Sequence, residues 1–176
     1  MTEQDRLVLD ADISDRVRAE LVGIGMADRL RGSMDCRLSV HLLCGETVHG
    51  VLCHVGADAL VLDEEQHQAL VPYASVARYT GLGRLAPGEV SSVKRRLGLA
   101  HALRGLARDR AQLSMTVGAG ATSVRLAGVI DRVGADFLDL ALVAPGEVRR
   151  NAQVRQVSTV PFTAISLVRS SGTGAL

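Results

Sequence analysis

Apolar and polar residues alternate along the first half of the chain in a pattern typical of short β-strands. Residues 38–42 alternate strictly, which predicts a strand with one buried face. Turns that contain Gly45 and Gly56 separate this strand from further predicted strands over 47–55 and 59–62. Two more short apolar runs complete a set of five strands. Strands this short with tight turns favour a small closed barrel, which has no exposed sheet edges.

Two segments show the wider spacing of amphipathic helices. From Pro87 to about Arg110, apolar residues recur at intervals of three and four, and the Pro-Gly-Glu start suits a helix N-terminus. The segment from Asp12 to Arg31 has similar spacing. Gly98 and Gly105 each cost about 1 kcal/mol relative to alanine. We therefore expect the second helix to be stabilised by packing against the strands.

Four blocks of sequence recur in the same order in the two halves of the chain. Val-Gly-Ala-Asp at 55–58 recurs letter for letter at 133–136. The other three blocks pair Leu30–Gly32 with Leu103–Gly105, Arg37–Val40 with Gln112–Met115, and Val71–Val76 with Val160–Ile165. Four ordered matches rarely arise by chance, so we expect two tandem copies of one module, with domains at 1–82 and 83–176.

The expected order of a helix and five strands, with a glycine-centred bend at Gly50, resembles the Sm-like barrel of the LSm and Hfq proteins. The stretch from Leu38 to Tyr79 carries this resemblance, and Leu113 to Val168 is similar. The resemblance implies a mainly β fold of two tandem Sm-like five-stranded barrels, each preceded by an N-terminal α-helix. It also implies RNA binding and ring assembly. The Arg-Gly pair of the family's second signature is replaced by other residues at 71–74 and 160–163.

Composition and charge narrow the classes of function. The 20 basic and 19 acidic residues give a net charge of +1, so the chain as a whole does not attract nucleic acid or anionic lipid. Aromatic residues make up 2% of the chain and offer few surfaces for stacking on bases. No apolar run approaches a membrane span, and the polar start at 1–5 is unlike a signal peptide. With three cysteines read as reduced thiols, we expect a cytoplasmic protein with no membrane partner.

Two basic clusters are the candidate nucleic-acid-binding residues. They comprise Lys94, Arg95 and Arg96 in the predicted second helix and Arg149, Arg150 and Arg155 in a long loop over 141–159. Either cluster could contact phosphates, although a charge run is also typical of a solvated face. We expect residues 142–158 to project as a β-hairpin or mobile loop.

The sequence indicates no catalytic or metal site. Cysteines and histidines crowd into residues 36–54, but they include no Cys-x-x-Cys pair, and strand alternation sends neighbours to opposite faces. No nucleophile–base pair is visible, and no cofactor motif is present. Asp58 and Asp136 occupy the same turn in the two halves, where we expect them to accept hydrogen bonds from turn amides.

The leading hypothesis is therefore a non-enzymatic binding protein without a cofactor, acting on RNA or in regulation. The alternative is a protein-interaction or assembly scaffold that binds no nucleic acid, which the near-zero net charge favours. A ligand-binding barrel is disfavoured because the strands are too short to enclose a large cavity. Self-association into a homo-oligomer is expected because small barrels have little interior in which to bury an apolar fraction of 47%.

Overall fold

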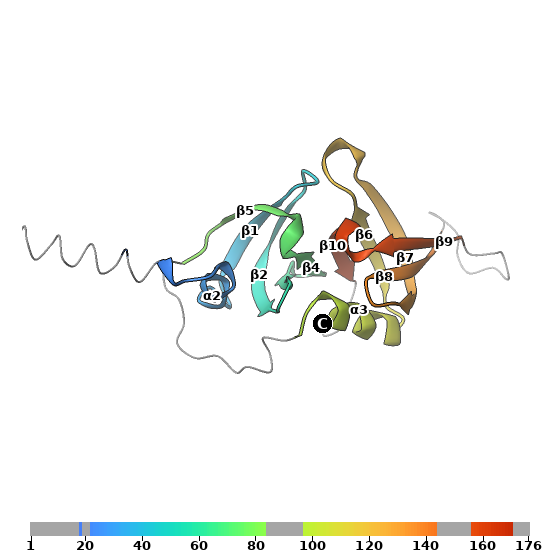
Figure 1. Ribbon diagram of the computed structural model, residues 1–176, viewed down its shortest axis with the longest axis horizontal. Helices are drawn as coiled ribbons and strands as arrows, with labels where there is room; N and C mark the ends of the chain where they lie inside the picture. Colours follow the sequence, from blue (N-terminus) through green and yellow to red (C-terminus); the bar gives the residue numbers. More distant parts are fainter. Residues whose placement is uncertain (1–17, 19–21, 84–96, 144–155, 171–176) are drawn as a thin grey trace, which may run out of the picture.

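The computed structural model of the chain describes residues 18, 22–83, 97–143 and 156–170 (Figure 1). These residues contain two α-helices, ten β-strands and three short 3₁₀ helices. In chain order they are α2 (Met26–Arg31), β1 (Arg37–Leu42), β2 (Thr47–Val55), β3 (Ala59–Asp63), β4 (Gln68–Pro72), η1 (Tyr73–Ser75), β5 (Val76–Thr80), α3 (Leu99–Arg108), β6 (Gln112–Val117), η3 (Gly120–Thr122), β7 (Val124–Val133), β8 (Phe137–Leu142), β9 (Val157–Pro161), η4 (Phe162–Ala164) and β10 (Ile165–Ser170).

All ten strands belong to one antiparallel sheet. Their order across the sheet is β5-β1-β2-β3-β4-β10-β6-β7-β8-β9. The two halves of the sheet have the same strand order. In each half, the last strand in the chain comes first, followed by the other four in chain order. Within the part of the chain that the structure describes, β5 and β9 are the two edges, and Figure 1 places them toward opposite ends of the molecule.

The prediction of two tandem, closed five-stranded barrels, each preceded by a helix, is wrong. Closing the first five strands would require β4 to pair with β5, but β4 pairs with β10 instead. The 3₁₀ turn at 73–75 separates β4 from β5 and lets β5 reach β1 on the far side. The matching sequence blocks therefore lie in one open sheet rather than in tandem Sm-like barrels, and this sheet crosses the boundary expected at residues 82 and 83.

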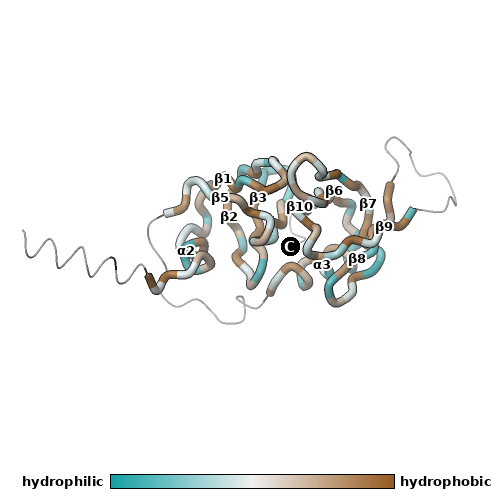
Figure 2. Tube along the Cα trace, turned by 45° about the horizontal axis from the view of Figure 1, so that its top comes forward, coloured by the Kyte–Doolittle hydropathy of each residue, from teal (hydrophilic) through white to brown (hydrophobic). Residues whose placement is uncertain are grey.

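The pairing of β4 with β10 joins the two halves, and we call it the central joint. Its register pairs Leu70 with Val168 and Ala69 with Arg169. The core follows the same connection, because apolar side chains of the first half lie in a cluster built mainly by the second. These are Ala59, Val61 and Leu70, which join Leu99, Leu103 and Leu106 of α3 and Val168 of β10. Figure 2 shows apolar and polar stretches alternating along the chain in both halves.

Both helices are shorter than the sequence pattern predicts. In the first, the chain leaves the helical conformation at 23–25, so the described helix α2 begins only at Met26. In the second, Gly98 has an extended backbone and helix α3 begins at Leu99, while residues 84–96 lie outside the described part. The helix expected from Pro87 to Arg110 is therefore interrupted at 97–98. No helix in the described ranges is long and apolar enough to cross a membrane.

Glycine allows two strands to pass close to their neighbours. A Cβ atom added at Gly50 in β2 would lie 2.6 Å from the carbonyl oxygen of Asp63 in β3. One added at Gly128 in β7 would overlap the carbonyl oxygen of Ala141 in β8. The register shifts of these pairs follow shortly after, between Leu52 and His54 and at the corresponding point of β7. The bend predicted at Gly50 thus coincides with a close approach of backbones that a side chain would prevent.

Candidate interaction site at the free edge of the sheet

The six predicted phosphate-binding residues lie outside the part of the chain that the structure describes. Lys94, Arg95 and Arg96 fall within 84–96, and the three arginines of the insertion fall within 144–155. Nucleic-acid binding by these residues therefore stays a prediction. The described ends of the insertion pair with each other, since Ala141 of β8 lies opposite Val157 of β9.

The cysteines and histidines at 36–54 lie on and next to β1 and β2. In the described ranges, no group of three or more His, Cys, Asp or Glu side chains is placed to hold a metal ion. Cys44 is buried and Cys36 is exposed. The thiol of Cys53 donates to the carbonyl oxygen of Val61 (3.3 Å), and burial, with the nearby charge of Asp63, raises its pKa.

Two cross-strand hydrogen bonds cover the outer face of β1 and β2. Ser39 Oγ lies 2.8 Å from His49 Nδ1, and His41 Nδ1 lies 3.1 Å from Thr47 Oγ1. Loss of solvation and the nearby charge of Arg78 lower the pKa of His41. No carboxylate among the described residues hydrogen-bonds His49, so the Ser–His pair has no third group to orient it for nucleophilic catalysis. The face is a polar surface of paired side chains.

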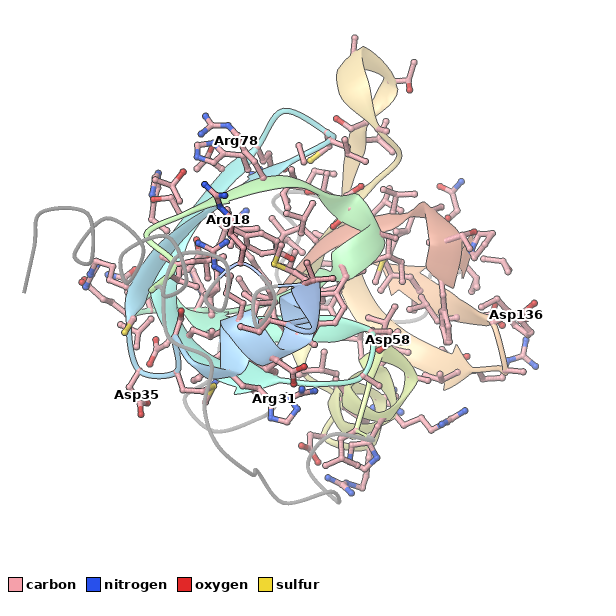
Figure 3. The ribbon with its side chains drawn as sticks, turned by 60° about the vertical axis from the view of Figure 1, so that its left-hand side comes forward. Arg18, Arg31, Asp35, Asp58, Arg78 and Asp136 are labelled. Carbon is pink, nitrogen blue, oxygen red and sulfur yellow. The ribbon has the colours of Figure 1, made fainter. Side chains whose placement is uncertain are left out.

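Asp58 accepts a hydrogen bond from a helix instead of from its own turn. Its Oδ1 lies 2.7 Å from the backbone amide of Leu99, the first residue of α3. Figure 3 shows Asp58 against the start of that helix, where a carboxylate is favoured by the unpaired amides and the helix dipole. Asp136 occupies the corresponding turn of the second half, and it is exposed. At Asp58 the expected hydrogen bond from a turn amide is thus replaced by one from the helix amide of Leu99, across the two halves.

An ion-pair network also crosses the central joint. Arg169 of β10 donates through Nε (2.7 Å) and Nη2 (3.2 Å) to both carboxylate oxygens of Glu64, and through Nη1 (3.0 Å) to Glu46. Glu46 also accepts from Thr116 (2.7 Å) and Arg125 (3.0 Å). Burial raises the pKa of Glu46, but the hydrogen bonds from Thr116, Arg169 and Arg125 outweigh it, so the net pKa is lowered. The network holds the two halves together and leaves the carboxylates satisfied.

An open groove follows the free edge strand β5. Met26 and Arg29 of α2 line one side, and residues 76–82 line the other. Its apolar residues are Met26, Val76, Ala77, Tyr79 and Leu82, and its charged residues are Arg29 and Arg78. No acidic side chain lines it in the described part of the chain. The groove is thus partly apolar and carries positive charge.

The backbone of β5 is available along this groove. The amide of Leu42 in β1 donates to the carbonyl oxygen of Glu46 (2.9 Å). The backbone N–H and C=O groups of even-numbered residues of β1 therefore point toward β2, and those of odd-numbered residues point toward β5. Ser39 pairs with Thr80, so the backbone groups of Thr80 point toward β1. The N–H and C=O of Tyr79 therefore point to the free side of the sheet.

The other edge, β9, is open in the same way. The amide of Leu142 donates to Gln156 (2.9 Å), and antiparallel bonds recur at every second residue. The amides of Val157 and Thr159 consequently point away from β8. Val157 is half exposed, and Pro161, which has no amide hydrogen, ends the strand. Both edges thus present backbone groups that an added strand could pair with.

No protein-family model matches this sequence, and no curated protein sequence matches it. The edge site itself could not have been found from the sequence. Residues 76–80 read as an ordinary short strand, and whether a strand lies at an edge depends on the order of all the others. Pro161 is no signal of an edge, because Pro72 ends the interior strand β4 in the same way.

Proposed function

We propose that the protein is a non-enzymatic interaction module that binds an extended segment of a partner protein by adding it as a strand to β5. The observation that carries this proposal is the position of the Tyr79 backbone. Its N–H and C=O point to the free side of the sheet, beside a groove that is partly apolar. Strand addition uses such a pair: main-chain hydrogen bonds supply affinity, and alternate side chains enter neighbouring pockets.

The composition of β5 supports the same function. Edge strands that must avoid partners are commonly blocked by proline or by charged residues, lysine above all. The sequence Val-Ala-Arg-Tyr-Thr of β5 contains no proline or lysine and one charged residue, Arg78. Arg29 and Arg78 give the groove positive charge. The favoured partner is therefore an extended peptide with alternating apolar residues and at least one carboxylate near the arginines.

Selection from a random peptide library against the full chain tests the proposal. Selected peptides should alternate apolar residues with acidic ones, and amide hydrogen exchange should show new protection at Tyr79 on binding. Replacing Arg29 and Arg78 with Glu should weaken these peptides at least tenfold. The matched control replaces Arg104 and Arg108 of α3 with Glu, which leaves the groove unchanged and should leave affinity unchanged. Peptides that bind without protecting Tyr79, or no binding at all, would refute the proposal.

A further inference from the structure

We propose that the acidic group of the peptide that β5 accepts is a phosphorylated side chain, bound on the outer face of the sheet by Arg78 and Thr80. This inference rests on the proposed function and names the class of its partner. The outer face is the side of β1, β2 and β5 that carries Ser39, His41 and His49. Two features of the fold support it: the charge of this face, and the direction of the side chains on an added strand.

Arg78 and Thr80 both lie on the outer face, next to the open edge. In the pairing of β5 with β1, Arg78 lies opposite His41 and Thr80 lies opposite Ser39. Side chains of opposed residues share one face of a sheet. Both residues are exposed, and Figure 3 shows the Arg78 side chain directed away from the sheet. Tyr79, which lies between them, packs against the core on the other face, so the two side chains are open to a ligand at the edge.

A row of hydrogen-bonding side chains leads from this edge into the outer face. Arg78 Nη1 donates to Thr80 Oγ1 (3.3 Å), and Thr80 Oγ1 lies 3.3 Å from His41 Nε2. His41 Nδ1 in turn lies 3.1 Å from Thr47 Oγ1. In the described part of the chain the Arg78 guanidinium makes no ion pair, and its other N–H groups can therefore serve a ligand.

The three strands of this face carry basic residues and no acidic one. Strands β1, β2 and β5 contain Arg37, Arg78 and three histidines, and their sequences include neither Asp nor Glu. Arg37 is compensated by Glu65 from the turn after β3 (3.4 Å), whereas Arg78 has no such partner among the described residues. Loss of solvation, followed by the charges of Arg78 and His49, lowers the pKa of His41. An anion at the edge would relieve this repulsion.

An added strand would place alternate side chains on the outer face. Because the backbone of Tyr79 points to the partner, a partner residue opposite Thr80 would form a non-hydrogen-bonded pair with Cβ atoms about 4.5–5.5 Å apart. Its side chain would lie on the outer face, beside Thr80 and diagonal to Arg78. The adjacent partner residues would point to the other face, where Tyr79 and Leu82 pack against the core. The site therefore selects one anionic residue flanked by apolar ones.

A phosphate fits this position better than a carboxylate. A phosphorylated side chain carries about −1.5 to −2 charge at neutral pH and three strong acceptor oxygens, whereas a carboxylate has a single charge and two oxygens. The guanidinium of Arg78 can bind two phosphate oxygens side by side, and the Thr80 hydroxyl can donate to the third. The added negative charge would also favour protonation of His41, which supplies a second cation.

A phosphate on a peptide is favoured over a phosphate of nucleic acid. The described strands β1, β2 and β5 place no Phe, Tyr or Trp on the outer face, so bases would find no ring to stack on. The free N–H and C=O of Tyr79 match the main chain of a peptide. A sugar–phosphate backbone has no N–H to donate to that carbonyl oxygen.

Three peptides that differ at one position test the proposal. Each alternates valine and threonine, and its central threonine is replaced by phosphoserine, glutamate or serine. Fluorescence anisotropy with the full chain should show that the phosphoserine peptide binds at least about tenfold more tightly than the glutamate peptide, and the glutamate peptide more tightly than the serine peptide. Amide exchange should show new protection at Tyr79 when the phosphoserine peptide binds.

Variants of Arg78 test whether this side chain holds the phosphate. Arg78→Gln should reduce the advantage of phosphoserine over glutamate to about twofold or less, while the serine peptide stays within about twofold of its original affinity. Arg78→Lys keeps the charge without the planar fork and should retain an intermediate preference. The matched control is Arg37→Gln, on the same face but paired with Glu65, and it should leave the preference unchanged. Because both arginines are exposed, far-ultraviolet circular dichroism should be the same for all variants.

The possible results separate this inference from the proposed function. Equal affinity for the phosphoserine and glutamate peptides, or a preference that survives Arg78→Gln, would overturn the phosphate site, and library peptides that protect Tyr79 would then leave strand addition standing. A single-stranded oligoribonucleotide that displaces the phosphoserine peptide and itself depends on Arg78 would overturn the inference in favour of nucleic acid. If neither the library peptides nor the phosphoserine peptide protects Tyr79, the inference and the function are refuted together.

Discussion

Removing Arg169 tests how strongly the ion-pair network holds the central joint. Its guanidinium makes two hydrogen bonds to Glu64 and one to Glu46, and the side chains are only 20%, 17% and 25% exposed. Arg169→Met keeps most of the aliphatic stem and removes the charge. A fully buried pair that loses one partner costs about 3–5 kcal/mol, and an exposed pair costs up to about 1 kcal/mol. Because these side chains are about four-fifths buried and Glu46 keeps Thr116 and Arg125, we expect a loss of about 2–3 kcal/mol.

Urea unfolding of a double-mutant cycle measures this loss. Arg169→Met, Glu64→Gln and the double variant should show a coupling free energy of at least about 1 kcal/mol, because Glu64 is left partly buried without a cation in the first variant. For a domain of this size, each kcal/mol lowers the melting temperature by about 2–4 °C. Arg125→Met is the matched control, since Arg125 is more exposed and touches only Glu46 in the network. A loss below about 0.5 kcal/mol with no coupling would show that the joint depends on strand pairing and apolar burial alone.

Three further changes have expected outcomes. Asp58→Ala should destabilise the chain by about 0.5–2 kcal/mol, because the first amide of α3 loses its acceptor, and Asp136→Ala at the corresponding turn should change the free energy of unfolding much less. The lowered pKa of Glu46 adds stability that is fully present above the ordinary value of 4.5 and is lost as pH falls through the folded-state pKa, so Glu46→Gln should flatten the decline of stability measured in acid. Gly128→Ala should lower the melting temperature sharply, because its Cβ overlaps the carbonyl of Ala141, whereas Gly45→Ala meets open space and pays only for its positive φ.

The sequence predicted local structure well where a short-range pattern decides it. Alternation at 38–42 predicted β1, which the structure places at 37–42. The helix ends were wrong because the spacing of apolar residues continues through Gly98, where the backbone is extended. The cap on α3 comes from Asp58, 41 residues away, and no local pattern indicates it. The sequence pattern singles out the Asp58 carboxylate, but only the folded structure shows that its partner is the amide of Leu99.

The arrangement of strands was wrong for a different physical reason. A run such as Ala69-Leu70-Val71 is buried on both faces, and this pattern shows that a strand is interior without showing which strand lies beside it. The closed barrel and the open sheet differ in whether β4 pairs with β5 or with β10. The matching sequence blocks favoured the pairing of β4 with β5, its neighbour in the chain. The edge site depends on the same choice, because β5 is open only if β4 has another partner.

The central joint and the groove beside β5 should respond differently to salt. At the joint, Val61 and Leu70 are buried in a shared core, and salt does not screen the burial of apolar surface. At the groove, Arg29 and Arg78 supply the charges that an acidic peptide would contact.

Salt should therefore weaken the binding of a selected acidic peptide while leaving the chain folded. Exposed charges act over about 10 Å at 0.1 M salt and only about 3 Å at 1 M. Fluorescence anisotropy of the labelled peptide should show weaker binding at the higher concentration, with unchanged far-ultraviolet circular dichroism at both. Affinity that rises at 1 M salt would mean that the apolar residues of the groove, rather than its arginines, dominate the contact.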